Sequence, residues 1–290
     1  MEYALFLGCF IPAREPSYEL AVRQVMKAFD IDLVDLKEAS CCAPIPIESL
    51  DHLTSTVIAA YNLCLAEEAN LDLMPICNGC FQVLSKTNKL LKSSKELKEK
   101  TNEVLKTIGK EFKGTIEVKS YLQVLCDDVG IDKIKNSVVK PLNGLNVAVF
   151  YGCHLLKPSS ILKVDDPEDP HIIDDLVELT GAVSVPYMYK KRCCGNPLKG
   201  VSDDIANKLG RDKLFYAKQA QADCFVTVCP SCFLQLDLGQ LVIRRKFNET
   251  YDLPVFHYPE LLALAMGMDP KEMALNTHRV RTEKIIKKIG

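Results

Sequence analysis

Cysteine is the residue type in this sequence with the clearest chemical potential. Thirteen of the 290 residues are cysteine. Ten of them form two sets that share one order, a single Cys, a Cys-Cys pair and a Cys-x-x-Cys motif. The first set is Cys9, Cys41, Cys42, Cys77 and Cys80, and the second is Cys153, Cys193, Cys194, Cys229 and Cys232. Thiolates are soft metal ligands, whereas structural disulfides are rare in the cytosol. The pattern therefore predicts two metal or redox centres.

The two cysteine sets are copies of one arrangement. Both Cys-Cys pairs and both Cys-x-x-Cys motifs repeat with an offset of 152 residues, and Cys153 follows Cys9 by 144 residues. The neighbouring residues repeat as well, because a glycine precedes both Cys9 and Cys153. This regularity predicts an internal duplication, with an N-terminal domain over residues 1–140 and a C-terminal domain over residues 141–290.

The number of sulfurs in each set indicates what they bind. Five cysteines are one more than tetrahedral zinc or a cubane 4Fe–4S cluster requires. Two of the five are adjacent, and adjacent side chains reach different atoms of a polynuclear centre more easily than one metal atom. The count favours an unusual iron–sulfur cluster, with structural zinc as the alternative. Cys64, Cys126 and Cys224 lie outside the repeat, and we expect them to be small buried hydrophobic residues.

These cysteines need a scaffold, and the hydrophobic pattern predicts one. Short apolar segments alternate with amphipathic helical stretches in both halves. The predicted strands cover residues 3–8, 31–36, 71–76, 115–118, 145–151, 183–186, 224–228 and 254–256. Such alternation predicts an α/β fold, a duplication of two Rossmann-like halves with parallel sheets. The ten repeated cysteines then lie at the carboxyl ends of strands or in the loops that follow, the edge where such sheets bind ligands.

Composition limits the partners and the location. The chain has 36 Lys and Arg against 38 Asp and Glu, a net charge of −2, which argues against nucleic acid as a partner. No apolar run reaches the ~20 residues that a membrane-spanning helix needs. The first residues lack the pattern of a secretion signal. We therefore expect a cytoplasmic globular protein that does not insert into a membrane directly.

The doubled cysteine pattern resembles the CCG domain. Two copies in a chain of this length resemble the B subunit of heterodisulfide reductase from methanogenic archaea, and the resemblance covers essentially the whole sequence. The first copy reads Cys41-Cys42-Ala43 where the second reads Cys193-Cys194-Gly195, so one glycine is replaced while all five sulfurs are kept. The resemblance implies two noncubane 4Fe–4S clusters, one on each set of five cysteines.

The resemblance also implies a reaction and its partners. The expected enzyme is a disulfide oxidoreductase that reduces the mixed disulfide of coenzyme M and coenzyme B to two thiols in methanogenesis. Electrons would arrive through the ferredoxin-like C subunit from the A subunit, which contains flavin and iron–sulfur centres, within an electron-bifurcating complex. A hydrogenase or formate dehydrogenase would be the outer donor. Because a disulfide takes up two electrons, we expect it to bind between the two halves, with each sulfur captured by one cluster.

Histidines and basic residues are candidates for the remaining roles. His154 directly follows Cys153, and His257 ends the last predicted strand. A histidine is a natural proton donor near neutral pH, so both are predicted catalytic residues. Their plain structural interpretation is helix capping or orientation of a cluster. The implied substrate is anionic, and the candidate substrate-binding residues are Lys190, Lys191, Arg192, Lys199, Arg14 and Lys157. Such charges are also common on solvated surfaces.

Two other functions remain open from the sequence. CCG repeats also occur in the iron–sulfur electron-transfer subunit of 2-hydroxy-acid (glycolate or lactate) oxidoreductases, which is the first alternative. A zinc-stabilised scaffold without catalytic activity is the second. Analysis of bound iron, sulfide and zinc separates the scaffold from the enzymes. Assays with a disulfide or with a hydroxy acid then separate the two enzymes.

Overall fold

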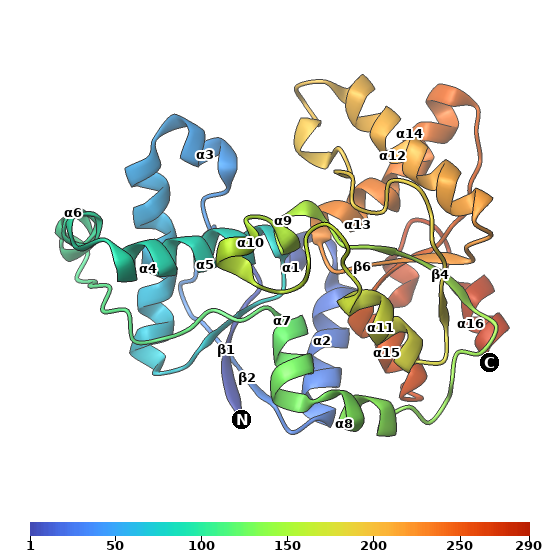
Figure 1. Ribbon diagram of the computed structural model, residues 1–290, viewed down its shortest axis with the longest axis horizontal. Coiled ribbons are helices and arrows are strands. Elements are labelled where there is room, and N and C mark those ends of the chain that lie inside the picture. Colours follow the sequence, from blue (N-terminus) through green and yellow to red (C-terminus); the bar gives the residue numbers. More distant parts are fainter. The chain divides into compact units, whose positions relative to one another are not determined.

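The chain divides into two compact units (Figure 1). The computed structural model describes residues 1–290, apart from the side chain of Ile45. The N-terminal unit consists of Met1–Arg14, Met26–Val129 and His154–Val164, and the C-terminal unit of Glu15–Val25, Gly130–Cys153 and Asp165–Gly290. Each half of the sequence thus contributes the segment after its first cysteine to the other unit. The boundary at residue 140 stays a prediction about the duplicated sequence.

Each unit contains one parallel sheet. In the N-terminal unit β1 (Glu2–Phe6) lies between β2 (Asp32–Asp35) and β3 (Leu73–Pro75). In the C-terminal unit β4 (Asn146–Phe150), β5 (Val183–Ser184), β6 (Cys224–Thr227) and β7 (Val255–His257) form a sheet of order β5-β4-β6-β7. The central strands β1 and β4 are buried and apolar, as expected for parallel sheets covered by helices. The predicted α/β fold with parallel sheets is confirmed.

Helices form the rest of the N-terminal unit. The longest are α4 (His52–Ala69), α5 (Asn78–Ser93) and α6 (Lys95–Lys106), which contact one another (Figure 1). Their buried faces supply Leu63, Leu84 and Leu105 to a common core. The shorter elements are α1 (Ile11–Arg14), α3 (Ile45–Leu50), α7 (Tyr121–Gln123), a π-helix (Val124–Val129) and α10 (Ser159–Leu162). Two helices, α2 (Pro16–Ala28) and α9 (Cys153–Leu156), contain residues of both units.

The C-terminal unit surrounds its sheet in the same manner. Its core joins β4 and β6 to α12 (Asp203–Gln219), α13 (Pro230–Leu236) and α14 (Leu238–Phe247). The remaining helices are α8 (Ile131–Asn136), α11 (Ile172–Leu179), α15 (Tyr258–Ala265), α16 (Glu283–Ile289) and the 3-10 turns Asn196–Leu198 and Leu275–Thr277. Among the described residues, no helix has the length and apolar character needed to cross a membrane.

The predicted strand over residues 115–118 is wrong. This segment makes one isolated parallel bridge, between Leu73 and Val118. Elsewhere its backbone groups bind side chains rather than a strand. The Glu67 carboxylate accepts a hydrogen bond from the N–H of Thr115 at 2.8 Å, and a side-chain amide of α5 donates to the carbonyl of Ile116. Helix side chains thus satisfy the polar backbone groups that a neighbouring strand would otherwise satisfy.

Candidate metal centres

The repeated cysteines lie where parallel sheets bind ligands. The single cysteine of each set follows β1 or β4, and the Cys-Cys pairs lie in the loops after β2 and β5. Cys77 and Cys229 are extended residues directly before α5 and α13, so Cys80 and Cys232 fall in the first turn of those helices. The N–H groups at a helix start favour a thiolate over a thiol.

Sulfurs of the N-terminal set contact one another. Cys42 hydrogen-bonds with both Cys41 and Cys80, and Cys80 with Cys77. Cys9 lies within electrostatic range of Cys41. A glycine is needed at the end of β1, because a Cβ on Gly8 would lie 3.0 Å from the Sγ of Cys80 and its φ is +68°. Three strand ends therefore bring the N-terminal sulfurs together.

In the C-terminal set all five sulfurs are linked. The hydrogen-bonded pairs are Cys153 with Cys193, Cys193 with Cys194, Cys194 with Cys232, and Cys232 with Cys229. Backbone groups add to this arrangement. The N–H of Gly195 donates to the Sγ of Cys193 and the N–H of Asn196 to the Sγ of Cys194, both at 3.4 Å. Such N–H donors stabilise negative charge on ligand sulfurs.

One thiol in each set is markedly acidic. Hydrogen bonds from Cys41 and Cys80 lower the pKa of Cys42 to about 5. In the C-terminal set, hydrogen bonds from Cys153 and Cys194 lower the pKa of Cys193. The hydrogen bond to Cys42 raises the pKa of Cys80, as does its burial. Several thiolates buried together are unfavourable unless a cation compensates their charge.

This donor set fits iron–sulfur chemistry. Each unit gathers several cysteine sulfurs, which are soft metal ligands. The donor chemistry therefore matches the predicted iron–sulfur clusters.

The three cysteines outside the repeat have separate environments. None of the thirteen cysteines forms a disulfide in the described structure. Cys64 is buried in the N-terminal core, where burial raises its pKa to about 12, and Cys224 is buried at the start of β6. Both follow the prediction of small buried hydrophobic residues. Cys126, on the π-helix, is only half-buried, and the prediction of burial is wrong for it.

His154 belongs to the N-terminal unit, although it follows Cys153 in the sequence. A Cβ on Gly79 would lie 3.5 Å from Nδ1 of His154 and 3.7 Å from the Sγ of Cys77. The half-buried imidazole therefore lies beside the Cys-x-x-Cys motif of the N-terminal set. This placement is compatible with proton transfer and with orientation of the cysteines, and the catalytic role stays a prediction.

His257 is enclosed in the C-terminal unit. Its side chain is fully buried and stacks between the rings of Tyr18 and Phe233, at centroid distances of 3.7 and 4.6 Å. Its Nε2 lies 2.8 Å from Oε2 of Glu15, and its backbone N–H donates to Glu260 at the start of α15. These contacts are those of a buried helix-capping residue. A role as proton donor stays a prediction.

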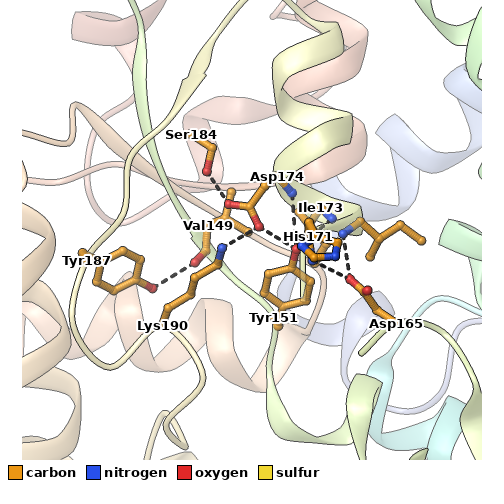
Figure 2. Close-up of polar contacts among 10 residues, drawn as sticks. Val149, Tyr151, Asp165, His171, Ile173, Asp174, Ser184, Tyr187 and Lys190 are labelled. Atoms are coloured by element: carbon orange, nitrogen blue, oxygen red, sulfur yellow. Dashed lines mark hydrogen bonds and ion pairs between the residues drawn. The ribbon is translucent and has the colours of Figure 1, made fainter. Parts of the chain in front are cut away.

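Lys190 is held by a polar network of the C-terminal unit (Figure 2). Its Nζ lies 2.6 Å from Oδ2 of Asp174, on α11, and 5.2 Å from the centre of the Tyr151 ring. Asp174 also accepts hydrogen bonds from the hydroxyl groups of Tyr151 and Ser184. Lys190 therefore fixes the loop that precedes Cys193 to the neighbouring helix.

Three more of the basic candidates lie near the second Cys-Cys pair. Lys191 and Arg192 are exposed, and the guanidinium of Arg192 stacks over the Tyr189 ring at 4.6 Å. Lys199 is half-buried, and its Nζ donates to Oδ1 of Asn207. The loop that carries these residues thus places positive charge next to the C-terminal cysteines, and their role in anion binding stays a prediction.

The last two basic candidates are in the N-terminal unit. Arg14 is the exposed last residue of α1. Lys157 is exposed, and its carbonyl accepts a hydrogen bond from Nε2 of Gln82 at 2.8 Å. The structure therefore divides the six predicted substrate-binding residues between the units, four in the C-terminal unit and two in the N-terminal unit.

Sequence reasoning did not identify the buried helix residues that hydrogen-bond to the backbone of the cysteine loops. Lys213, which is 1% exposed, donates to backbone carbonyls of the loop before Cys193. Asn62, which is fully buried, donates a hydrogen bond to the backbone carbonyl of Cys41 in the corresponding loop of the N-terminal unit. The available signal was a polar residue on an apolar helix face, because Lys213 shares its face with Ala206, Gly210, Leu214 and Ala217.

Several known proteins are similar to this chain in sequence. Residues 3–85 and 147–237 match the family CCG, Cysteine-rich domain. The chain is 40% identical to the B subunit of the ferredoxin:CoB-CoM heterodisulfide reductase of Methanosarcina mazei, over 99% of this chain and 96% of that protein. It is 31% identical to the 8-methylmenaquinol:fumarate reductase membrane anchor subunit of Wolinella succinogenes, over 98% and 99% of the two chains.

A solved structure has a similar fold. The crystal structure of a hypothetical protein from Helicobacter pylori aligns with a TM-score of 0.77 at 14% sequence identity. The alignment covers 97% of this chain and 52% of that chain. At this identity the likeness concerns the fold alone, and it agrees with a duplicated α/β architecture.

Proposed function

Since the chain belongs to the family of heterodisulfide reductase B subunits, with two copies of the cysteine-rich domain, we propose that it reduces the mixed disulfide of coenzyme M and coenzyme B to two thiols. The observation that carries the proposal is the gathering of one cysteine set in each compact unit. Identity of 40% over nearly the full length of a named reductase subunit supports the choice of substrate.

We propose that each cysteine set holds one noncubane 4Fe–4S cluster. Cys9, Cys41, Cys42, Cys77 and Cys80 would hold the first, and Cys153, Cys193, Cys194, Cys229 and Cys232 the second. When bound, the clusters supply the electrons that the disulfide takes up. The chain contributes the buried thiolates and the N–H donors of Gly195 and Asn196, which stabilise the negative charge of ligand sulfurs.

The reaction also requires protons. Reduction breaks one S–S bond, takes up two electrons and two protons, and releases two thiols. His154 is the first candidate donor, because its Nδ1 lies close to the backbone of Gly79, beside Cys77. His257 is the second candidate, and its hydrogen bond to Glu15 orients the ring. A protonated imidazole can donate its proton to the thiolate that forms when the S–S bond breaks.

Positive side chains are proposed to bind the anionic ends of the substrate. The exposed candidates are Lys191, Arg192, Arg14 and Lys157. Lys190 and Lys199 are proposed to act mainly through the loop, because Asp174 and Asn207 already bind their ammonium groups. Exposed cations interact with anions most strongly at low ionic strength, so substrate affinity should fall as salt rises.

We infer that the chain works as one component of a cytoplasmic electron-bifurcating complex. The name of the M. mazei relative, which is one of several reductase subunits, supports the existence of partner subunits. The partners we propose are the A subunit, with flavin and iron–sulfur centres, and the ferredoxin-like C subunit. A hydrogenase or a formate dehydrogenase would supply electrons to this complex.

A second candidate function is electron transfer in a quinol:fumarate reductase. The W. succinogenes relative with that name aligns with this chain over nearly the whole length of both proteins. In this case the chain would pass electrons to another protein of its complex and would not reduce a disulfide. The two candidates share the cofactor and differ in the substrate, which makes them separable by assay.

The test combines cofactor analysis with turnover. We expect about eight irons and eight acid-labile sulfides per full-length chain, since two clusters of four are proposed. Adding the heterodisulfide to the reduced protein should change its spectrum and release two thiols per disulfide. Cys80→Ser should lose about half of the iron, whereas the matched control Cys64→Ala, outside the repeat, should keep it. Zinc in place of iron would refute the proposal. Iron without thiol release would favour the second candidate.

A further inference from the structure

The loops that carry the two Cys-Cys pairs are supported by corresponding helices with different side chains. Applying the offset of 152 residues, Lys213 on α12 corresponds to Tyr61 on α4. Both residues lie on the helix that follows the Cys-Cys pair, and both hydrogen-bond to backbone carbonyls of the loop before that pair. The position is therefore equivalent in the two copies, but its charge is not.

In the C-terminal unit the support is an ammonium group. Nζ of Lys213 donates to the carbonyl of Tyr189 at 2.5 Å and to that of Arg192 at 2.6 Å. It also lies 4.1 Å from the centre of the Phe150 ring. Two carbonyl acceptors and an aromatic face are a suitable environment for a cation. The turn that they stabilise ends directly before Cys193.

In the N-terminal unit the support is neutral. The hydroxyl of Tyr61 donates to the carbonyl of Glu38 at 3.2 Å. The neighbouring Asn62 accepts from the N–H of Ser40 at 2.8 Å and donates to the carbonyl of Cys41 at 3.2 Å. The groups that make these hydrogen bonds are therefore a hydroxyl and an amide, both of which are neutral.

We propose that Lys213 is a positioning residue that makes the two iron–sulfur clusters unequal. Its positive charge, bound to the loop that precedes the second Cys-Cys pair, raises the reduction potential of the C-terminal cluster above that of the N-terminal cluster. This inference rests on the proposed function, because it requires a cluster on each set of cysteines.

The physical reason is the change of charge on reduction. A cluster that accepts an electron becomes more negative, and a nearby cation stabilises that state. Lys213 lies within electrostatic range of Cys193, Cys194 and Cys232, and its burial keeps water from screening the interaction. Two backbone carbonyls and the face of the Phe150 ring surround the Lys213 ammonium with groups that favour a positive charge. Electrons that enter the chain then reside preferentially on the C-terminal cluster.

A redox titration of the full-length, iron-loaded chain tests the proposal. Midpoint potentials of the two clusters are followed by electron paramagnetic resonance. Lys213→Gln keeps an amide donor and removes the charge. Lys213→Arg keeps the charge. Tyr61→Phe removes the corresponding hydroxyl of the N-terminal unit without a change of charge and serves as the matched control. The Cys42→Ser variant, which disrupts the N-terminal set, identifies the signal of the C-terminal cluster.

We expect Lys213→Gln to make only the C-terminal cluster about tenfold harder to reduce, a shift of about 59 mV for a one-electron couple. Lys213→Arg and Tyr61→Phe should leave that potential unchanged. Unchanged potentials in Lys213→Gln, or an equal shift of both clusters, would overturn the proposal while leaving the proposed function intact. A native chain without iron would overturn both.

A second variant covers the case in which Lys213→Gln loses its iron. Tyr61→Lys places an ammonium at the corresponding, half-buried position of the N-terminal unit. The proposal requires the N-terminal potential to rise toward that of the C-terminal cluster. An N-terminal potential equal to that of the native chain would overturn it.

Discussion

Gly195, directly after the second Cys-Cys pair, is predicted to be intolerant of any side chain. Its φ of +89° lies in the left-handed region. A Cβ at this position would lie 2.8 Å from the carbonyl oxygen and 3.1 Å from the Cα of Ala206, and 3.1 Å from the Cβ of Leu209. The first two atoms belong to the backbone of α12, which cannot yield without moving the helix.

The expected cost of Gly195→Ala has two parts. The left-handed conformation costs an L-residue about 1–2 kcal/mol. Forcing an additional methyl against a packed backbone costs a further ~1–3 kcal/mol. A total of about 3 kcal/mol should lower the midpoint of thermal unfolding by about 6–12 °C for a unit of this size. The same displacement should disturb the N–H of Gly195, which donates to Cys193.

Thermal unfolding followed by circular dichroism measures this effect. Gly144→Ala is the matched control in the same unit, because Gly144 has a φ of +79° and a Cβ there would meet no atom within 4 Å. Gly144→Ala should lose only the ~1–2 kcal/mol that the left-handed backbone conformation costs an L-residue. In the N-terminal unit, Ala43 takes the equivalent position with a φ of +56°, so Ala43→Gly should not lower stability. Equal losses in Gly195→Ala and Gly144→Ala would refute the steric reasoning.

Three further predictions concern buried or half-buried polar contacts. Burial lowers the pKa of His278, but the charge and hydrogen bond of Glu260, together with the charge of Asp237, outweigh burial, so the net shift is upward. The stabilisation that protonated His278 gives the fold is complete below the unfolded pKa of about 6.5 and is lost as pH rises through the folded pKa. The midpoint of thermal unfolding of His278→Gln should therefore fall most, relative to the native chain, at low pH. A difference between the two midpoints that does not depend on pH would contradict this. Glu67→Ala should cost about 3 kcal/mol in urea unfolding, because the carboxylate accepts three backbone N–H groups, and an unchanged midpoint would contradict it. Asp174→Asn should weaken the ion pair to Lys190 and accelerate cleavage by trypsin after Lys190. A cleavage rate equal to that of the native chain would contradict this prediction.

Much of the fold followed from local pattern. Alternating apolar segments and helices predict parallel sheets, and in a parallel sheet the carboxyl ends of all strands lie at the same edge. Because the cysteines follow the strands directly or lie in the loops after them, their grouping in each unit was predictable from order and spacing. The error at residues 115–118 has a different origin. The apolar pattern there resembles a strand, but apart from one bridge to Leu73 its backbone binds side chains distant in the sequence, among them the carboxylate of Glu67.

The sequence by itself determined the duplication, the two cysteine sets and the α/β class, because these depend on spacing that recurs along the chain. Only the tertiary structure decided which side chains surround them. His154 adjoins Cys153 in sequence yet lies beside Gly79, and the buried Lys213, outside the basic run at Lys190, supports the loop before Cys193. Burial and the identity of a contact partner depend on residues far apart in the chain, and spacing along the sequence carries no information about them.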